Sequence, residues 1–371
     1  MRTPSATPRL AELASVHPLT VPDVAKDHLR ILLVAKHARA SGQAHAEDGS
    51  HAIYHAEMRD VLQDIGFNLS IADDYRALFE RPDADYVFPL LNRGGFLNSE
   101  MMLPLLCNRL GLPYLGGGPI IRGLSDDKHL TKLVARSRGI PTADWAVYRR
   151  NTPIDPVRCP QADRFVVKPN ASSASWGVRA VEGWSEVRDA VEALHEEGHD
   201  AIVEPFITGH DLEVSIITIA DRPVILPTMI VEQEDPGALR SYNEKRDLDG
   251  GAKSYAIRPY EDASRIDEIE AAALNLMQEF APFDYGRFEC RIDAATGQIQ
   301  FLEVNLNCNL WSQKTISMAA RLAGWSHHQL IETILAESLR RNGLLAKAAE
   351  RASWMAGGYQ MAVPRRAAAA R

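Results

Sequence analysis

The chain has 371 residues, enough for two or three domains, and its 46% hydrophobic and 24% charged content is ordinary for a soluble globular protein. A formal net charge of −8 argues against a general nucleic-acid binder, and no apolar run is long enough to span a bilayer. Cys107, Cys159, Cys290 and Cys308 lack the spacing of a zinc ribbon or a disulfide framework, and the N-terminus lacks the apolar core of a secretory signal. We therefore expect a cytoplasmic protein.

The N-terminal third alternates between strand and helix patterns. Residues 1–28, rich in Pro, Ala and Thr, indicate an irregular arm. The expected elements after it are strands at 29–35, 68–71 and 86–91 and helices at 51–65 and 99–110. This alternation predicts a parallel sheet covered by helices, in a domain spanning residues 29–120.

Two lysine-bearing segments follow. Ser125 is a candidate N-cap for a helix that carries Lys128 and Lys132 on one face, a pattern that by itself indicates only a solvated helix face. Lys168 ends an apolar strand and precedes a loop of small residues that includes Ser175. A lysine in this position can neutralise phosphate charge, while small residues let backbone N–H groups approach the phosphate.

The next segments carry isolated acids and a polar loop. Glu204 lies in an apolar strand over 201–207, and Asp211 and Glu213 begin a long strand; edge-strand charges in water are the alternative interpretation. Residues 241–251 form a polar loop that contains Tyr242 and Lys245, and residues 262–280 have helical periodicity. Further helices are expected at 317–322 and at 326–339, the latter capped by Ser326.

A hairpin over 287–305 concentrates oxygen ligands. Its strands are expected on either side of a turn at 293–297, so Glu289 lies across from Glu303, with Asn305 two residues further on the same face. Two carboxylates and an amide oxygen are ligands that Mg²⁺ prefers, completed by water and nucleotide phosphates. An exposed acidic hairpin is the alternative.

In this order, over residues 85–340, the motifs resemble those of the ATP-grasp carboxylate–amine ligases, most closely the D-alanine–D-alanine ligases. The resemblance implies an ATP-grasp fold, which is α/β with an α+β C-terminal half. It implies three parts: the N-terminal parallel-sheet domain, a small central domain over 121–207 and a C-terminal antiparallel-sheet domain over 208–343, followed by a tail at 344–371. A homodimer is implied as well.

The resemblance also assigns roles. Expected ATP contacts are Lys128, Lys168, Ser175, Glu204 at the adenine amino group or the ribose, the backbone of Phe206 and Ile207, Asp211 at the ribose, and Lys245. Glu213 is a rival for the ribose. Glu289, Glu303 and Asn305 would hold two Mg²⁺ ions, replaceable by Mn²⁺, that bridge the ATP phosphates, and Arg287 would steady the oxyanion of the tetrahedral intermediate.

The substrate motifs depart from the family's pattern. Where the family has a His-Gly-x-Gly-Gly-Glu-type stretch, this chain has Leu-Asn-Arg-Gly-Gly-Phe at 91–96. The Pro-Gly turn and serine expected after the metal-binding Asn are replaced by a stretch containing Asn309, Trp311 and Lys314. We expect Tyr242, Asn309 and Lys314 to contact substrate, and Lys314 to pair with a carboxylate. Phe96 and Trp311 indicate a more apolar pocket.

These observations predict an ATP-dependent ligase that joins amino-acid-like carboxylates and amines other than two D-alanines, through an acyl phosphate, with ADP and phosphate as products. Its partners are small molecules, with no nucleic acid and no membrane. The alternatives are closure of a ring or use of a different nucleophile, and a catalytically silent ATP-binding protein. A zinc hydrolase built on His51 and His55 is a third alternative, less favoured than a solvated helix start, and Cys308 is expected to pack rather than react.

Overall fold

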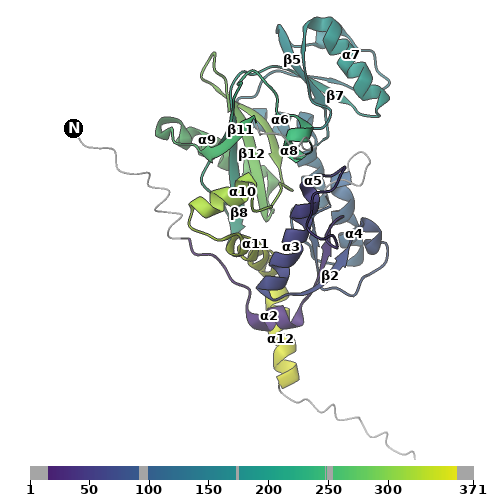
Figure 1. Ribbon diagram of the computed structural model, residues 1–371, viewed down its shortest axis with the longest axis vertical. Coiled ribbons are helices and arrows are strands. Elements are labelled where there is room, and N and C mark those ends of the chain that lie inside the picture. The colour runs from purple at the N-terminus through teal and green to yellow at the C-terminus, as the bar shows by residue number, and fades with distance from the viewer. Residues whose placement is uncertain (1–15, 92–98, 173–174, 247, 249–253, 357–371) are drawn as a thin grey trace, which may run out of the picture.

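The computed structural model describes residues 16–91, 99–172, 175–246, 248 and 254–356, which build three sheets (Figure 1). The first sheet is parallel, in the order β2-β1-β3, with Arg30 opposite Asn68 and Ile31 opposite Tyr86. Its elements are α2 (Asp23–His28), β1 (Arg30–Val34), α3 (His51–Ile65), β2 (Asn68–Ala72), the 3-10 helix η1 (Tyr75–Leu78), β3 (Tyr86–Pro89), the 3-10 helix η2 (Ser99–Met101), α4 (Met102–Leu110) and α5 (Pro119–Asp126).

The continuous apolar run of β1 reflects burial on both faces of the sheet. Ile31 and Leu33 belong to the largest hydrophobic cluster, whereas Leu32 and Val34 pack with residues of α4. A strand buried on both sides has no polar face, so its sequence does not alternate.

The second sheet is antiparallel, in the order β4-β7-β5-β6, and helix α7 packs on it at the top of Figure 1. Its elements are α6 (Lys128–Ser137), β4 (Ala146–Tyr148), the 3-10 helix η3 (Pro156–Arg158), β5 (Arg164–Pro169), β6 (Arg179–Glu182), α7 (Gly183–Glu196) and β7 (Ala201–Pro205). Val167, Val187, Leu194 and Val203 are fully buried between the sheet and α7. This small core is separate from the larger ones.

The third sheet is antiparallel, in the order β11-β10-β8-β12-β13, with β9 paired to β8. Its strands are β8 (Asp211–Ile219), β9 (Arg222–Ile225), β10 (Met229–Gln233), β11 (Tyr255–Pro259), β12 (Tyr285–Ile292) and β13 (Ile299–Asn305). The accompanying helices are α8 (Tyr242–Arg246), α9 (Ala263–Met277), the 3-10 helix η4 (Gln278–Phe280), α10 (Thr315–Leu322), α11 (His327–Arg341) and α12 (Leu344–Ala356).

The first and third sheets share the largest hydrophobic cluster, which contains Leu33, Phe88, Ile217 and Leu335. A buried polar network also joins them. Asp284 accepts hydrogen bonds from the Gly116 amide at 2.6 Å, the Ser338 hydroxyl at 2.9 Å and the Arg341 guanidinium at 2.7 Å. The N-terminal part is thereby held against the start of β12 and against α11.

Four expectations about local structure are wrong. Residues 242–246 of the expected polar loop form α8. The arm is not irregular throughout, because residues 23–28 form α2, and the tail begins with α12, which packs against α2 and buries Leu344 and Ala348. The N-cap of α6 is Asp127, whose carboxylate accepts from the Leu130 amide at 2.9 Å, whereas the Ser125 hydroxyl donates to the Arg122 carbonyl within α5. The boundaries of the three parts stay a prediction.

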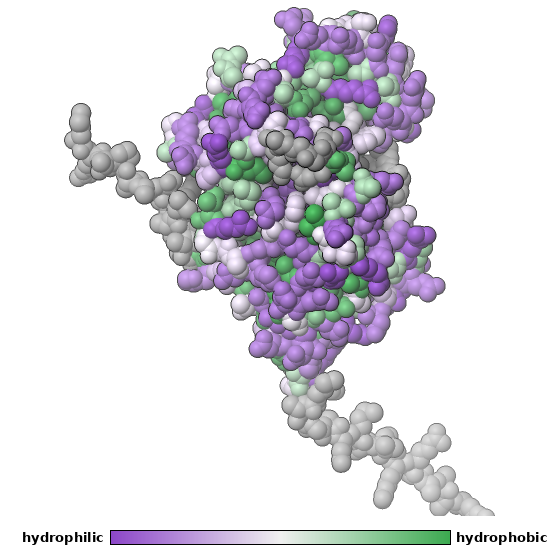
Figure 2. All heavy atoms as spheres, in the orientation of Figure 1, coloured by the Kyte–Doolittle hydropathy of each residue, from purple (hydrophilic) through white to green (hydrophobic). Residues whose placement is uncertain are grey.

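The surface offers no apolar belt on the face drawn in Figure 2, where hydrophilic residues dominate and hydrophobic ones are scattered. In the part of the chain that the structure describes, every helix is too short or too polar to cross a membrane.

Candidate active site

The β12–β13 hairpin brings together the residues expected to bind metal. Glu289 pairs with Glu303 in the register and Arg287 with Asn305, and the register shifts immediately after Glu289. On the opposite face Phe288 and Phe301 are fully buried in the core. Glu289 itself is 6% exposed, so the alternative of an acidic hairpin with its charges in water is wrong.

The charges around this hairpin are paired but not balanced. The Arg287 guanidinium donates to Glu289 Oε1 at 2.6 and 2.9 Å and lies 3.0 Å from Glu213 Oε2. Burial, reinforced by the nearby Glu303 and Glu213 carboxylates and opposed by Arg287, raises the pKa of Glu289 to about 7. Carboxylates crowded in this way bind a divalent cation favourably, because the cation offsets their repulsion.

Glu303 faces the lysines instead. Its carboxylate lies 3.2 Å from Lys128 Nζ, which also donates to the Ser172 carbonyl at 2.9 Å. Burial alone would raise the pKa of Glu303, but the positive charges of Lys128, Lys168 and Lys245 outweigh it and hold the pKa below its usual range. Lys128 is 5% exposed, which excludes the solvated helix face. Glu289, Glu303 and the Asn305 amide oxygen form a donor set that fits Mg²⁺.

Glu204, Lys132 and Lys168 form a buried ion triad. The Glu204 carboxylate lies 2.8 Å from Lys168 Nζ and 2.9 Å from Lys132 Nζ, and Lys132 is completely buried. Burial opposes the charge of Glu204, but the two ammonium groups prevail and lower its pKa to about 2. The expected contact of Glu204 with adenine or ribose stays a prediction; the structure adds that both of its oxygens face lysines.

Asp211 and Glu213 begin β8 and bind arginines. Arg291 Nε donates to Asp211 at 2.6 Å, and Arg240 lies 3.0 Å from Asp211 and 3.2 Å from Glu213. Arg291 also donates to the Ile207 carbonyl at 2.8 Å. Sequence reasoning missed both arginines. Arg291 shares the face of Glu289 two residues away, which was a usable signal, whereas Arg240 lies in a loop without any pattern.

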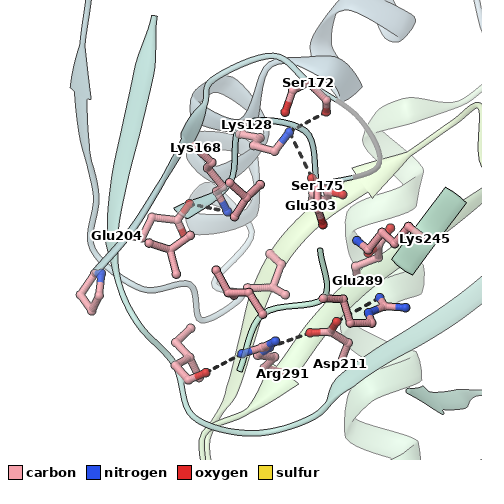
Figure 3. A pocket seen from close by; sticks show the side chains of 17 residues that line it. Lys128, Lys168, Ser172, Ser175, Glu204, Asp211, Lys245, Glu289, Arg291 and Glu303 are labelled. Atoms are coloured by element: carbon pink, nitrogen blue, oxygen red, sulfur yellow. Dashed lines mark hydrogen bonds and ion pairs between the residues drawn. The ribbon is translucent and has the colours of Figure 1, made fainter. Parts of the chain in front are cut away.

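A cavity of about 120 Å³ lies between the second and third sheets (Figure 3). Seven of the eight expected ATP contacts line it: Lys128, Lys168, Ser175, Glu204, Ile207, Asp211 and Lys245. Val166, Val178, Leu239 and Leu302 add apolar walls that sequence reasoning did not identify. Phe206 does not line this cavity as the described residues define it; its ring lies 4.0 Å from the Arg164 guanidinium carbon.

A second cavity, of about 270 Å³, lies between the third sheet and the N-terminal part. Asn305, Asn309, Lys314 and Arg287 line it. Of the expected substrate residues, Tyr242 is set back from the lining that the described residues form, and its ring lies 5.1 Å from the Arg246 guanidinium carbon. The residues that line both cavities are Arg240, Lys245, Glu289 and Glu303. The expected metal carboxylates therefore stand where the two cavities meet.

Helix α3 shapes the second cavity, a role that sequence reasoning missed. The Glu57 carboxylate accepts from the Trp311 indole at 3.0 Å and from the Ser312 amide and hydroxyl at 3.0 and 2.9 Å. The Tyr54 hydroxyl accepts from the Leu310 amide at 3.2 Å. The loop after β13 is thus tied to α3. Residues 92–96, and Phe96 with them, lie outside the described residues.

The histidines of α3 do not form the zinc site of the third alternative. Within the described residues, the group of three potential metal ligands that comes together is His37, His45 and Asp48, and neither His51 nor His55 belongs to it. Burial, with positive neighbours, lowers the pKa of His51 to about 2 and that of His55 to about 4. Burial raises the pKa of the Cys308 thiol to about 12, in line with packing.

Comparisons with known proteins place this geometry in a family. A family model described as D-ala D-ala ligase C-terminus matches residues 134–336, more than half of the chain. The chain belongs to the D-alanine–D-alanine ligase family. It is therefore an ATP-grasp protein and an ATP-dependent ligase that forms C–N bonds, and the family uses ATP and Mg²⁺.

Individual relatives are distant. The chain is 29% identical over 288 residues to the D-alanine–D-alanine ligase of Pseudomonas fluorescens, covering 76% of this chain and 85% of that protein. It is 29% identical over 254 residues to an uncharacterized protein of Sinorhizobium fredii, covering 66% of this chain and 72% of that protein. The D-alanine–D-alanine ligase of Bacillus anthracis complexed with ATP shares the fold, with a TM-score of 0.66, 19% identity, and coverage of 85% of this chain and 98% of that one.

Proposed function

We propose that this enzyme joins the carboxylate of one amino-acid-like molecule to the amine of another through an acyl phosphate, and that its substrates are not two D-alanines. The observation that carries the proposal is the junction of the two cavities at Glu289 and Glu303. One cavity suits a nucleoside triphosphate, and the other suits small polar molecules. At this junction a phosphoryl group could pass from one cavity to the other.

The first cavity would hold ATP. Lys128, Lys168 and Lys245 bring three ammonium groups to it, which suits a triphosphate chain. The Ser175 loop would approach the phosphates, the backbone of Phe206 and Ile207 would read the base, and Glu204 and Asp211 would face the adenine amino group and the ribose. Two Mg²⁺ ions, held by Glu289, Glu303 and Asn305, would supply the positive charge that phosphoryl transfer requires.

The second cavity would hold the reacting molecules. A substrate carboxylate oxygen attacks the γ-phosphorus, the bond to the bridging oxygen breaks, and ADP leaves. The amine of the second molecule then attacks the acyl carbon, loses a proton and expels phosphate. Arg287, fixed by Glu213 and Glu289, presents its guanidinium to the developing oxyanion. Asn309 and Lys314, which line this cavity, would position the substrates.

The proposal that D-alanine is not the substrate rests on the N-terminal wall. That wall carries histidines and cations, and the loop after the expected metal-binding Asn is bound to α3 through Trp311 and Ser312. Substrate choice depends on the polar groups of a pocket, since a buried group left unpaired by the wrong substrate costs free energy. The same wall would also serve an enzyme that closes a ring, which the product mass distinguishes.

The test is Mg²⁺-dependent release of ADP and phosphate in the presence of D-alanine, pools of L- and D-amino acids, small acids and amines, with products identified by mass spectrometry. The expected result is ADP release that requires one acid and one amine outside D-alanine and is lost in Glu303→Ala. Release of AMP would refute the acyl-phosphate route. A product lighter than one substrate by one water would show ring closure, and tight ATP binding without turnover on any pool would show a silent nucleotide-binding protein.

A further inference from the structure

The far wall of the second cavity is built from basic side chains. From the N-terminal part come Lys36, His37, Asp48, His51 and His55, and from the C-terminal part come Arg246 and Lys314. We call Lys36, His55 and Arg246, together with the carboxylate Asp48 that lies among them, the basic wall. Its residues line the same cavity as Glu289 and Glu303, beside which the carboxylate to be phosphorylated would sit.

The single carboxylate of the basic wall is already engaged. Asp48 accepts from Lys36 Nζ at 2.5 Å and lies 2.6 Å from His37 Nε2 and 3.9 Å from an Arg246 nitrogen. One negative charge is therefore shared between Lys36 and Arg246, and the wall remains cationic. Both hydrogen bonds fall on Oδ2 of Asp48, whereas its Oδ1 has the Arg246 nitrogen at 3.9 Å; the excess positive charge of the wall favours an anion over a substrate ammonium.

His55 presents a donor to this wall. The His37 backbone amide donates to His55 Nδ1 at 3.2 Å, so the neutral ring carries its proton on Nε2. The side chain is 4% exposed, and its Nε2 meets no hydrogen-bonding atom among the described residues. A buried N–H without an acceptor is costly, which indicates that an acceptor arrives with a ligand.

Arg246 presents a second donor. Its Nε is also buried without a hydrogen-bond partner in the described part of the chain. Its backbone carbonyl accepts from the Ser50 amide at 2.9 Å and from the Ser50 hydroxyl at 3.2 Å, which ties it to the start of α3. Gly49 has a φ of +54°, and a Cβ there would lie 2.1 Å from the Arg246 carbonyl oxygen. The close approach of the two segments thus requires glycine.

We infer that the basic wall binds a second carboxylate of the acid substrate, so that this substrate is a small dicarboxylate or an acidic amino acid. The inference rests on the proposed ligase function. The His55 and Arg246 donors and the Lys36 charge would face one carboxylate, while the other lies beside Glu289 and Glu303 and is phosphorylated. Lys314, which donates to the Lys245 carbonyl at 3.1 Å, lines the same cavity.

The first test measures binding to the full chain saturated with Mg²⁺ and ADP. Calorimetric titrations would compare succinate, glutarate and both enantiomers of aspartate and glutamate with succinamate, glutaramate, asparagine and glutamine. Because a hydrogen bond to a charged group strengthens binding by roughly tenfold or more, at least one dicarboxylate should bind roughly tenfold tighter than its monoamide. Arg246→Gln should remove most of this preference because it removes a positive charge, and His55→Leu should reduce it; both should weaken monoamide binding less than dicarboxylate binding.

The matched control is Arg188→Gln, on the exposed face of α7 beside Asp189 and Glu192, which should keep the preference. Gly49→Ala is a second route to the same result, because it displaces the Arg246 backbone without removing a charge; it should weaken the binding of dicarboxylates more than that of their monoamides. Equal affinities for dicarboxylates and monoamides, or a preference that survives Arg246→Gln, would overturn the inference.

Three further results would show which anion the wall binds, and would distinguish failure of the dicarboxylate proposal from failure of the ligase proposal. Inorganic phosphate that binds tighter than every dicarboxylate, in an Arg246-dependent way, would assign the wall to free phosphate and overturn the substrate assignment. ADP release that is as fast with monocarboxylic acids as with dicarboxylic acids would leave the ligase standing and overturn the dicarboxylate. Arg246-dependent dicarboxylate binding without ADP release for any acid and amine would uphold the wall's preference and overturn the ligase.

Discussion

Glu204→Gln tests the ion triad beneath the nucleotide cavity. The substitution keeps the size of the side chain but leaves Lys132 and Lys168 without their shared counter-charge. The pKa of Glu204 falls from 4.5 to about 2 in the folded state, and at about 1.4 kcal/mol per unit this corresponds to about 3 kcal/mol of stability at neutral pH. Breaking a buried pair from one side costs a similar amount, about 3–5 kcal/mol.

The assay is urea unfolding at pH 7, followed by circular dichroism, with the free energy of unfolding extrapolated to water. Glu192→Gln is the matched control, because its partner Arg188 lies 3.7 Å away and both side chains are half exposed; its loss should stay below about 0.5 kcal/mol. In Lys132→Met/Glu204→Gln, one orphaned charge is gone, and at least about 1 kcal/mol should return. A loss below about 1 kcal/mol for Glu204→Gln would refute the reasoning.

Three further outcomes are expected. Glu303→Gln should lower Mg²⁺-dependent ADP release by roughly 100-fold or more while Glu232→Gln, on an exposed pair, has no effect; equal activity in both variants would contradict the metal assignment. The folded state lowers the pKa of His55 from 6.5 to about 4, so protonation favours the unfolded chain, and the free energy of unfolding should fall as the pH drops from 6.5 toward 4. His55→Phe should therefore lose less stability in acid than the parent protein, and an unchanged loss would contradict this reasoning. Arg341→Met should cost about 3 kcal/mol by urea unfolding because it leaves Asp284 buried without its cation, and a loss under about 1 kcal/mol would show the pair to be dispensable.

The site's strands could be predicted because period two and a short turn leave little freedom. The alternation after Arg287 and the turn before Gly297 placed Glu289 opposite Glu303, which is the register observed. The helical pattern of apolar residues predicted α3 as His51–Ile65, and Gly66, which adopts a left-handed conformation, ends it. Local sequence patterns were sufficient to predict a hairpin and a helix, because both are formed by residues close together in the chain.

What could not be predicted depends on contacts between distant segments. Lys132 looked like a surface lysine beside Lys128, yet it is completely buried because Glu204, 72 positions away, accepts its charge. Arg240 bridges Asp211 and Glu213 from a loop that has no periodicity. Helix α12 was treated as a tail, since its apolar face gains meaning only when α2 lies against it.

The placement of α3 would allow this enzyme to differ in substrate from its relatives while it keeps their nucleotide chemistry. The ATP side rests on α6, β5, β7 and β13, whose carboxylates and lysines bind one another. The second cavity, by contrast, takes its far wall from α3 and the loop before it, and Glu57 on the same helix holds the loop of Trp311 and Ser312. A few substitutions on one helix would therefore alter both the charge of the wall and the position of the substrate loop. Because α3 makes no part of the first cavity's lining among the described residues, such changes would leave ATP binding intact.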